Sequence, residues 1–457
     1  MVLSMKNETI NHSGYINLKS DKHIAYDLKN GDLSIHVAED ISELDGKQEV
    51  FTTSFDREQY LFCLQIPFRV NDLQIYPWNY KQYIDCAIRN YQIESQYTKA
   101  VFRFDELQFF CHSVEDDSIP TNKQAPVSTE PIKEFKITID GKECLVKFQI
   151  RLTGIRHSSY KMNYISEVEI SFDETNDIAF LHKLYLTVYD SFVFICNRQN
   201  ITCTSMMLLG TYPTKRLKDG TAVDVISQCN SEMFFFNKYR EEPEDNVVIS
   251  HTSNVRGFIK HIDKLFKIIA DDLSRTEEDG DATISIVSIH PSVNRKNLID
   301  LQQSLHITSA FEFYFRRYLP PMLKEKEHHK KLKAILQTFM ETATGKEKKT
   351  AKSLLKHIGN ASLSDKIIAA YKGYDGWAAL SSCISENWFQ PNSIDSLAEI
   401  ASEWRNELAH DKREYQPSVD TVKAVRLIEH LNYAIVLRQL GYEDWEIQSL
   451  LEMTLVR

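Results

Sequence analysis

The 457-residue sequence lacks several features that would assign it to a specialised class of protein. No part of it is collagen-like or of low complexity. No run approaches the roughly 20 apolar residues that span a bilayer, and the polar first residues contain no apolar core of a signal peptide. None of the eight cysteines forms a C-x-x-C pair, so buried free thiols are expected rather than a zinc or redox motif. We therefore expect a globular, cytoplasmic protein without a membrane partner.

An excess of positive charge is also missing, since the net charge is −10 at pH 7. This balance excludes a basic surface all over the molecule but allows a local one. Residues 324–356 contain ten lysines against four acidic residues. Such a run is either a solvated helix face or a contact surface for RNA phosphates. The candidate RNA-binding residues within it are Lys330, Lys331, Lys348, Lys349 and Lys352.

The first half of the sequence has mainly the pattern of strands. Apolar residues alternate with polar ones over 135–139 and 145–152, and Asp140-Gly141 between them predicts a hairpin turn. Residues 164–172 alternate again and put Glu167 and Glu169 on one face. Further strands are expected at 60–66 and 100–110, and a helix at 176–198 with Asn176 or Asp177 as its cap. Residues 1–240 are therefore predicted to form a β-rich antiparallel domain, a sandwich or a barrel-like sheet.

The second half has the pattern of helices. Residues 240–245 are charged, contain proline and predict a linker. Amphipathic helices are expected at 255–273, 296–318, 323–342, 394–410 and 418–440, with a short β-branched run at 283–289. The last helix is apolar nearly all round, which suits a bundle centre or a dimer interface. The fold class is thus α+β and multidomain: a regulatory or sensing domain (1–240), a helical connector (241–290) and a helical bundle (291–457).

The strongest chemical signal lies between Trp404 and His410, where Arg405 and His410 form an R-x4-H pattern with Asn406 directly after the arginine. Histidine titrates near neutrality and can act as a general acid or base. Arginine offers planar donors that match a phosphate and the charge that develops on it. Because a 2′-hydroxyl can attack its neighbouring phosphate with such help, the pattern predicts a metal-independent ribonuclease site. The same spacing also occurs by chance in many helices.

Helical geometry complicates this site. At about 100° per residue, Asn406 and His410 share a face, whereas Arg405 and His410 lie about 140° apart on an ideal helix. Either the helix ends near residue 409 and His410 turns back, or two chains complete each site.

Three competing sites are rejected. Residues 344–346 resemble the end of a P-loop but lack its first glycine and its Ser or Thr. The adjacent His328 and His329 point apart on a helix and have no further ligand at metal spacing. In a strand, Cys111 and His112 would point to opposite faces and could not act as a nucleophile pair. No metal site and no cofactor are predicted.

The R-N-x-x-x-H element, ahead of a long apolar C-terminal helix, resembles the signature of HEPN domains. The upstream helix at 310–315 (A-F-E-F-Y-F) resembles the first HEPN helix, in which an acidic residue faces the site; this match makes Glu312 a candidate. The motif match covers about residues 291–457. A β-rich part ahead of such a domain resembles, in layout, the ApeA-type abortive-infection proteins of bacteria.

This resemblance implies an all-α HEPN bundle that dimerises through the HEPN domain and cleaves RNA without a metal. Arg405 and His410 would be the essential pair, with Asn406 in support. The role would be defence against phage, in which a sensor half releases the nuclease on a phage-derived trigger and tRNA or another host or phage RNA is cut. One alternative is a non-catalytic HEPN interaction or RNA-binding module. A toxin restrained by a separate antitoxin is less favoured, because a partner domain is built into the chain.

Overall fold

The structure, a computed structural model, divides the chain into two compact units, Met1–Arg275 and Thr276–Arg457. It describes residues 11–18, 23–36, 42–67, 80–112, 131–153, 163–197, 201–218, 221–236, 255–274, 301–320, 327–357, 361–374, 376–409 and 417–454. The first unit is built on an antiparallel sheet and the second is helical, which confirms the predicted fold class. The division falls inside the range predicted as a connector, 241–290.

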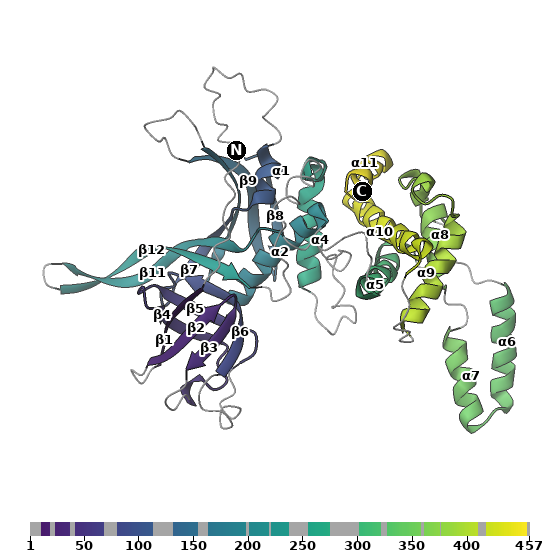
Figure 1. The fold of residues 1–457 in the computed structure, drawn as a ribbon, viewed down its shortest axis with the longest axis horizontal. Helices are drawn as coiled ribbons and strands as arrows, with labels where there is room; N and C mark the ends of the chain where they lie inside the picture. The colour runs from purple at the N-terminus through teal and green to yellow at the C-terminus, as the bar shows by residue number, and fades with distance from the viewer. Residues whose placement is uncertain are drawn as a thin grey trace, which may run out of the picture. The chain divides into compact units, whose positions relative to one another are not determined.

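Six strands at the beginning of the first unit close into a barrel (Figure 1). They are β1 (Asn11–Asn17), β2 (His23–Lys29), β3 (Asp32–His36), β4 (Glu49–Ser54), β5 (Gln59–Leu64) and β6 (Tyr80–Arg89), with a short 3-10 turn at Ser42–Leu44. Neighbours pair in the order β3-β2-β1-β4-β5-β6, and β3 also pairs with β6, which completes the ring. Alternate side chains of these strands form one buried apolar cluster. The barrel interior is therefore a packed core.

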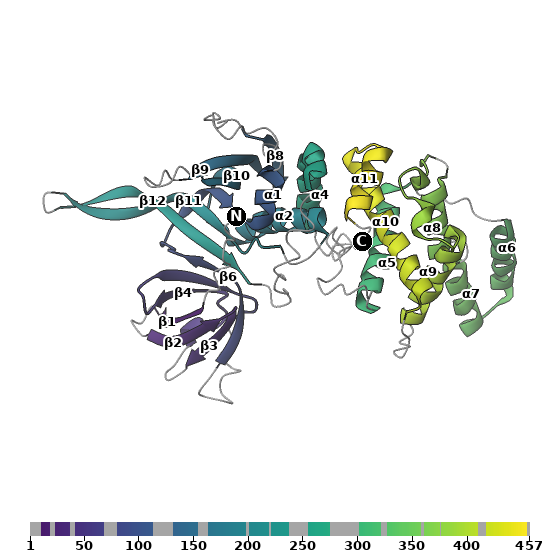
Figure 2. The ribbon, with the colours of Figure 1, turned by 45° about the horizontal axis from the view of Figure 1, so that its top comes forward.

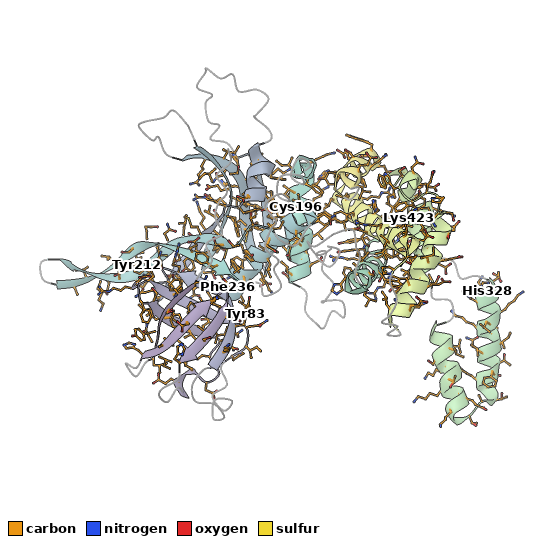
Figure 3. The ribbon with its side chains drawn as sticks, in the orientation of Figure 1. Tyr83, Cys196, Tyr212, Phe236, His328 and Lys423 are labelled. Atoms are coloured by element: carbon orange, nitrogen blue, oxygen red, sulfur yellow. The ribbon has the colours of Figure 1, made fainter. Side chains whose placement is uncertain are left out.

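The turn between β2 and β3 lies where the ring closes. Gly31 adopts φ +84°, a conformation that glycine reaches without strain. A Cβ there would meet Phe236 at 2.9 Å and Tyr83 of β6 at 3.0 Å, so the backbone lies directly on these rings. The Gly31 carbonyl accepts a bond from the Ile84 amide at 3.0 Å. Tyr83 and Phe236 lie near one another at this side of the barrel (Figure 3).

The same sheet continues beyond the barrel, because β6 pairs with β12 (Thr221–Phe235) as well. The order then runs β11 (Ser205–Lys218), β7 (Gln96–Phe102), β10 (Asn163–Thr175), β9 (Lys142–Thr153) and β8 (Lys133–Ile139). Strands β11 and β12 form a long hairpin that projects from the sheet (Figure 2). The predicted β8–β9 hairpin is confirmed, with Asp140 and Gly141 both at positive φ (47° and 77°).

Helices cover this second part of the sheet. They are α1 (Asp105–His112), α2 (Ile178–Cys196) and α4 (Ile262–Leu273), which follows a 3-10 segment at Val255–His261. Helix α2 packs against α4 and β8, and α4 also packs against β8. Asp177 caps α2 by accepting a bond from the Phe180 amide at 3.1 Å, in agreement with the prediction. Helix α4 is therefore part of the first unit.

Helix α2 is the one described helix long and apolar enough to cross a membrane, judged by length and composition. Of its most apolar window, 72% is buried inside the fold. Its buried residues continue to Cys196 at its end (Figure 3). A helix that is apolar on all sides needs cover on all sides, and here the sheet and α4 provide it.

The polar face of β10 is a buried ionic layer rather than a solvated surface. Glu167 is fully buried and Glu169 is 7% exposed. Arg103 donates to Glu167 from Nε at 3.1 Å and from Nη2 at 2.9 Å. Arg151 bridges Glu167 and Glu169, and Lys99 pairs with Glu169 at 2.9 Å. The two carboxylates are therefore neutralised by cations from β7 and β9 and from Arg103, which follows β7.

The second unit is a helical bundle around α10 (Val419–Leu440). Helices α5 (Leu301–Tyr318), α8 (Leu363–Lys372), α9 (Ile394–Ala409) and α11 (Asp444–Thr454) pack against it, with short 3-10 turns at Leu380–Ser382 and Glu386–Trp388. Asn432 of α10 is fully buried and donates to the Ile307 carbonyl of α5 at 3.1 Å. Most residues of α10 are buried, which confirms that this apolar helix lies at the centre of a bundle. The other interpretation, a dimer interface, stays a prediction.

The lysine-rich region forms a helical hairpin of α6 (Glu327–Thr342) and α7 (Gly345–His357). The two helices pack against each other, and α6 has no buried residue. His328 marks the start of α6 (Figure 3). The hairpin is stabilised chiefly by the contact between its own helices.

Several predicted elements need correction. The strand predicted at 100–110 ends with β7 at Phe102, and α1 follows. Cys111 and His112 therefore lie in a helix, where burial raises the pKa of the Cys111 thiol to about 12 and makes it a poor nucleophile. Helices α7, α8 and α11 were not predicted. The linker at 240–245 and the β-branched run at 283–289 lie outside the described residues.

All eight cysteines are buried and none is in a disulfide, which confirms the expectation of free thiols. The pairing of strands brings Cys63 and Cys86 opposite each other in β5 and β6.

Candidate active site in the helical bundle

Arg405 lies near the C-terminal end of α9, on the flank of a packed stripe. The stripe consists of Ile394, Leu397, Ala398, Ala401 and Trp404, all at most 5% exposed. Ser393 caps the helix by accepting a bond from the Ser396 amide at 3.2 Å. The packed stripe fixes the rotation of α9 about its axis. Arg405, on the flank of the stripe, therefore points away from the packed side, and its side chain is 43% exposed.

Glu312 of α5 faces this arginine. Arg405 Nη2 lies 3.2 Å from Glu312 Oε2, and the Glu312 side chain is 26% exposed. The acidic residue on the upstream helix and the arginine of the R-x4-H pattern, 93 positions apart in the sequence, thus meet in the structure. The pair holds one edge of the guanidinium in place.

A second cation contacts the same carboxylate. Lys366 Nζ of α8 lies 2.7 Å from Glu312 Oε1, and this lysine is only 18% exposed. Helix α8 begins with a capping box, in which Ser362 accepts from the Asp365 amide and Asp365 accepts from the Ser362 amide. Lys366 follows directly after the capping box, in the first turn of α8.

Lys366 was missed in the sequence. The S-L-S-D capping signal at 362–365 could have located the start of α8. Nothing in the sequence pairs a lysine at 366 with a glutamate at 312, because that contact depends on how α5 and α8 pack.

Of the remaining predicted site residues, Asn406 is exposed on α9, and His410 lies outside the described residues. The last described residue of α9 is Ala409. The structure therefore brings together Glu312 and Arg405, and the position of His410 relative to them stays a prediction.

The five candidate RNA-binding lysines are all exposed on the α6–α7 hairpin. Lys348, Lys349 and Lys352 recur at three- and four-residue spacing and share a face of α7. Lys330 of α6 pairs with Glu327 at 2.7 Å. The hairpin also exposes apolar residues, at Leu332, Ile335 and Phe339 of α6 and at Leu354 of α7. The basic surface is thus a separate feature from the Glu312–Arg405 pair.

The rejected alternatives can be placed in the same unit. Gly345, at φ 55°, is the first residue of α7, so residues 344–346 lie where the turn of this hairpin passes into that helix. His328 and His329 lie side by side at the start of α6 with ring centroids 4.2 Å apart, so the expectation that they point apart is wrong. Among the described residues, no group of three or more His, Cys, Asp or Glu side chains is placed to hold a metal ion.

Comparison with protein families identifies this part of the chain. Residues 305–445 match the family model described as Apea-like HEPN, which covers less than half of the chain. The match includes Glu312, Lys366, Arg405 and His410. No curated protein and no solved structure matches the chain. On the match and the helical architecture, residues 305–445 form an Apea-like HEPN domain, which follows a β-rich N-terminal unit.

Proposed function

We propose that the HEPN domain is an endoribonuclease that cleaves RNA without a metal ion and acts in defence against phage. An Apea-like HEPN domain supports a nuclease-type, defence-associated role. The observation that carries the finer proposal is the pair of Arg405 and Glu312, which presents a half-exposed guanidinium beside the polar face of α9.

In the proposed reaction, the 2′-hydroxyl of one nucleotide loses its proton and its oxygen attacks the adjacent phosphorus. The bond from phosphorus to the 5′-oxygen then breaks, and that oxygen takes up a proton. The products are a 2′,3′-cyclic phosphate and a 5′-hydroxyl. His410 would move one or both protons, and Arg405 would stabilise the charge on the phosphate oxygens. Glu312 would hold Arg405, and Asn406 would orient the phosphate or the histidine by hydrogen bonding.

The angular separation of Arg405 and His410 bears on assembly. If α9 continued as an ideal helix to 410, the two side chains would point about 140° apart. We therefore propose that the site is completed where the helix ends or, in a homodimer, by the neighbouring HEPN domain. Lysines 330, 331, 348, 349 and 352 would bind other phosphates of the same RNA, on the separate surface of the α6–α7 hairpin.

A non-catalytic module is the second candidate, because the contact of Glu312 with Lys366 and Arg405 also ties three helices together. In that case the arginine would serve the fold alone. The two interpretations differ in what happens when the contact is removed and the fold survives.

The test uses purified full-length protein and total RNA from the expression host, with and without a chelator. Arg405→Ala and His410→Ala should each abolish cleavage, while the wild type stays active in the chelator. Lys372→Ala is the matched control, since Lys372 forms an exposed ion pair with Asp395 at 2.8 Å, which joins α8 to α9 without Glu312. Full activity in either site variant, or loss of wild-type activity in the chelator, would refute the nuclease proposal. An inactive wild type that still binds RNA would favour the module.

A further inference from the structure

Three charged side chains meet at the proposed site, Glu312, Lys366 and Arg405, and their net charge indicates the role of Lys366. Glu312 carries one negative charge, and Lys366 and Arg405 carry one positive charge each, which leaves the group at +1. Without Lys366 the net charge of the group would be zero. Arg405 would then be neutralised by Glu312 before it met an RNA phosphate. The cluster of α5, α8 and α9 therefore needs the lysine in order to attract an anion.

The geometry separates the roles of the two cations. Lys366 occupies Glu312 Oε1 at 2.7 Å and is 18% exposed, whereas Arg405 contacts Glu312 Oε2 at 3.2 Å and is 43% exposed. The lysine is thus the closer and more buried partner, and the arginine is the one that reaches solvent. Since a charge-assisted bond is strong when it is short and shielded, the carboxylate is bound chiefly to Lys366.

We propose that Lys366 is a positioning residue of the HEPN site: it neutralises Glu312, so that Arg405 is oriented by the carboxylate but keeps its positive charge for an RNA phosphate. This inference rests on the proposed function. It assigns to Lys366 an electrostatic task that acts through Glu312 and involves no contact of the lysine with RNA.

The inference predicts a specific dependence between two substitutions. Lys366→Met removes the positive charge and keeps an aliphatic chain of similar length, so the group falls from +1 to zero. Glu312→Gln removes the negative charge, and in that background there is nothing left for Lys366 to neutralise. The double variant Lys366→Met/Glu312→Gln returns the group to +1. A lysine that only tied α5 to α8 would show no such recovery.

The experiment measures binding and cleavage separately in the full-length protein. Binding is followed by fluorescence anisotropy with a mixed-sequence single-stranded 2′-deoxyoligonucleotide, which lacks the attacking hydroxyl and cannot be cleaved. Cleavage is followed in a single turnover on total RNA from the expression host. Thermal melting of each variant reports on the fold.

Lys366→Met should weaken oligonucleotide binding about tenfold, and Lys366→Arg should restore it to within about threefold of the wild type. The double variant Lys366→Met/Glu312→Gln, again at +1, should bind within about threefold of the wild type and therefore more tightly than Lys366→Met alone. Lys372→Met is the matched control on the same helix, because Lys372 pairs with the Asp395 carboxylate of α9 and lies outside the cluster; this variant should bind as the wild type does.

A double variant that binds no better than Lys366→Met alone would overturn the inference, as would lower melting temperatures without weaker binding or a wild type that does not bind at all. A wild type that binds with this pattern but never cleaves would refute the nuclease proposal and leave the role of Lys366 intact. If the wild type cleaves RNA and Lys366→Met cleaves and binds equally well, the role of Lys366 is refuted and the nuclease proposal stands.

Discussion

The charged layer on β10 offers a sharp test of how the first unit is stabilised. Glu167 has no exposed surface, and its carboxylate accepts bonds from Arg103, from Arg151 and, at 2.8 Å, from Gln149. A buried carboxylate is tolerated only when such partners replace the water it has lost. Replacing Glu167 by glutamine keeps the shape of the side chain and removes its charge.

The expected loss can be bounded from the exposure of the partners. Breaking a fully buried ion pair costs about 3–5 kcal/mol, because the remaining charge has no solvent to turn to. Here Arg103 is 33% exposed and Arg151 is 50% exposed, so both recover part of their hydration. The carbonyl oxygen of the introduced amide can still accept one bond. We therefore expect a loss of about 2–3 kcal/mol in local stability.

Amide hydrogen exchange in the full-length protein measures this loss where it occurs. Glu167→Gln should speed exchange of the most protected amides of β9 and β10 by about 30- to 150-fold, which corresponds to that free energy. The control is Glu143→Gln on β9, whose partner Lys136 lies 2.8 Å away but where both side chains are about two-thirds exposed. It should leave exchange unchanged. If the two variants behaved alike, the argument from burial would be wrong.

Three further changes test other parts of the structure. Burial raises the pKa of Asp190 in α2 to about 7, so the folded unit favours the protonated acid and loses stability as pH rises from about 4 to about 7. Asp190→Asn should therefore stabilise the protein by about 2–4 kcal/mol more at about pH 8 than at about pH 4. An equal effect of the substitution in chemical denaturation at both pH values would contradict this. Replacing Lys348 and Lys349 by Glu should make the plot of log binding constant for RNA against log salt concentration shallower, with a slope smaller in magnitude by about 1–2. An unchanged slope would show that the hairpin is not part of the RNA-binding surface. Asn432→Ala should lower the free energy of unfolding of the bundle by about 1–3 kcal/mol, as read by tryptophan fluorescence in urea, because the buried bond to the Ile307 carbonyl is lost; wild-type stability would show that α10 does not need it.

Local patterns explain which parts of the fold could be predicted. The β8–β9 hairpin follows from alternation around Asp140-Gly141, a pair of residues that tolerates positive φ. Helix α2 follows from its apolar spacing and its cap at Asp177. In both cases the signal and the structure it specifies lie within about 20 residues of each other.

Non-local contacts explain what was missed. The barrel closes because β3 pairs with β6, so Asp32 lies opposite Tyr83, and no local pattern relates these two positions. The alternation around Glu167 predicted only a shared polar face, because the cations that neutralise it, Arg103 after β7 and Arg151 of β9, come from elsewhere in the chain. At the site, Arg405 could be singled out by its spacing and Glu312 by resemblance, whereas Lys366 has meaning only once α8 packs beside α5.

The central proposal is RNA cleavage by Arg405 and His410. Sequencing of RNA 2′,3′-cyclic phosphate and 5′-hydroxyl ends in cells, after induction of the wild type and of His410→Ala, tests it most directly. The proposal predicts new ends at defined positions with the wild type and none with His410→Ala. The same ends in both, or no new ends in cells whose growth the wild type arrests, would contradict it.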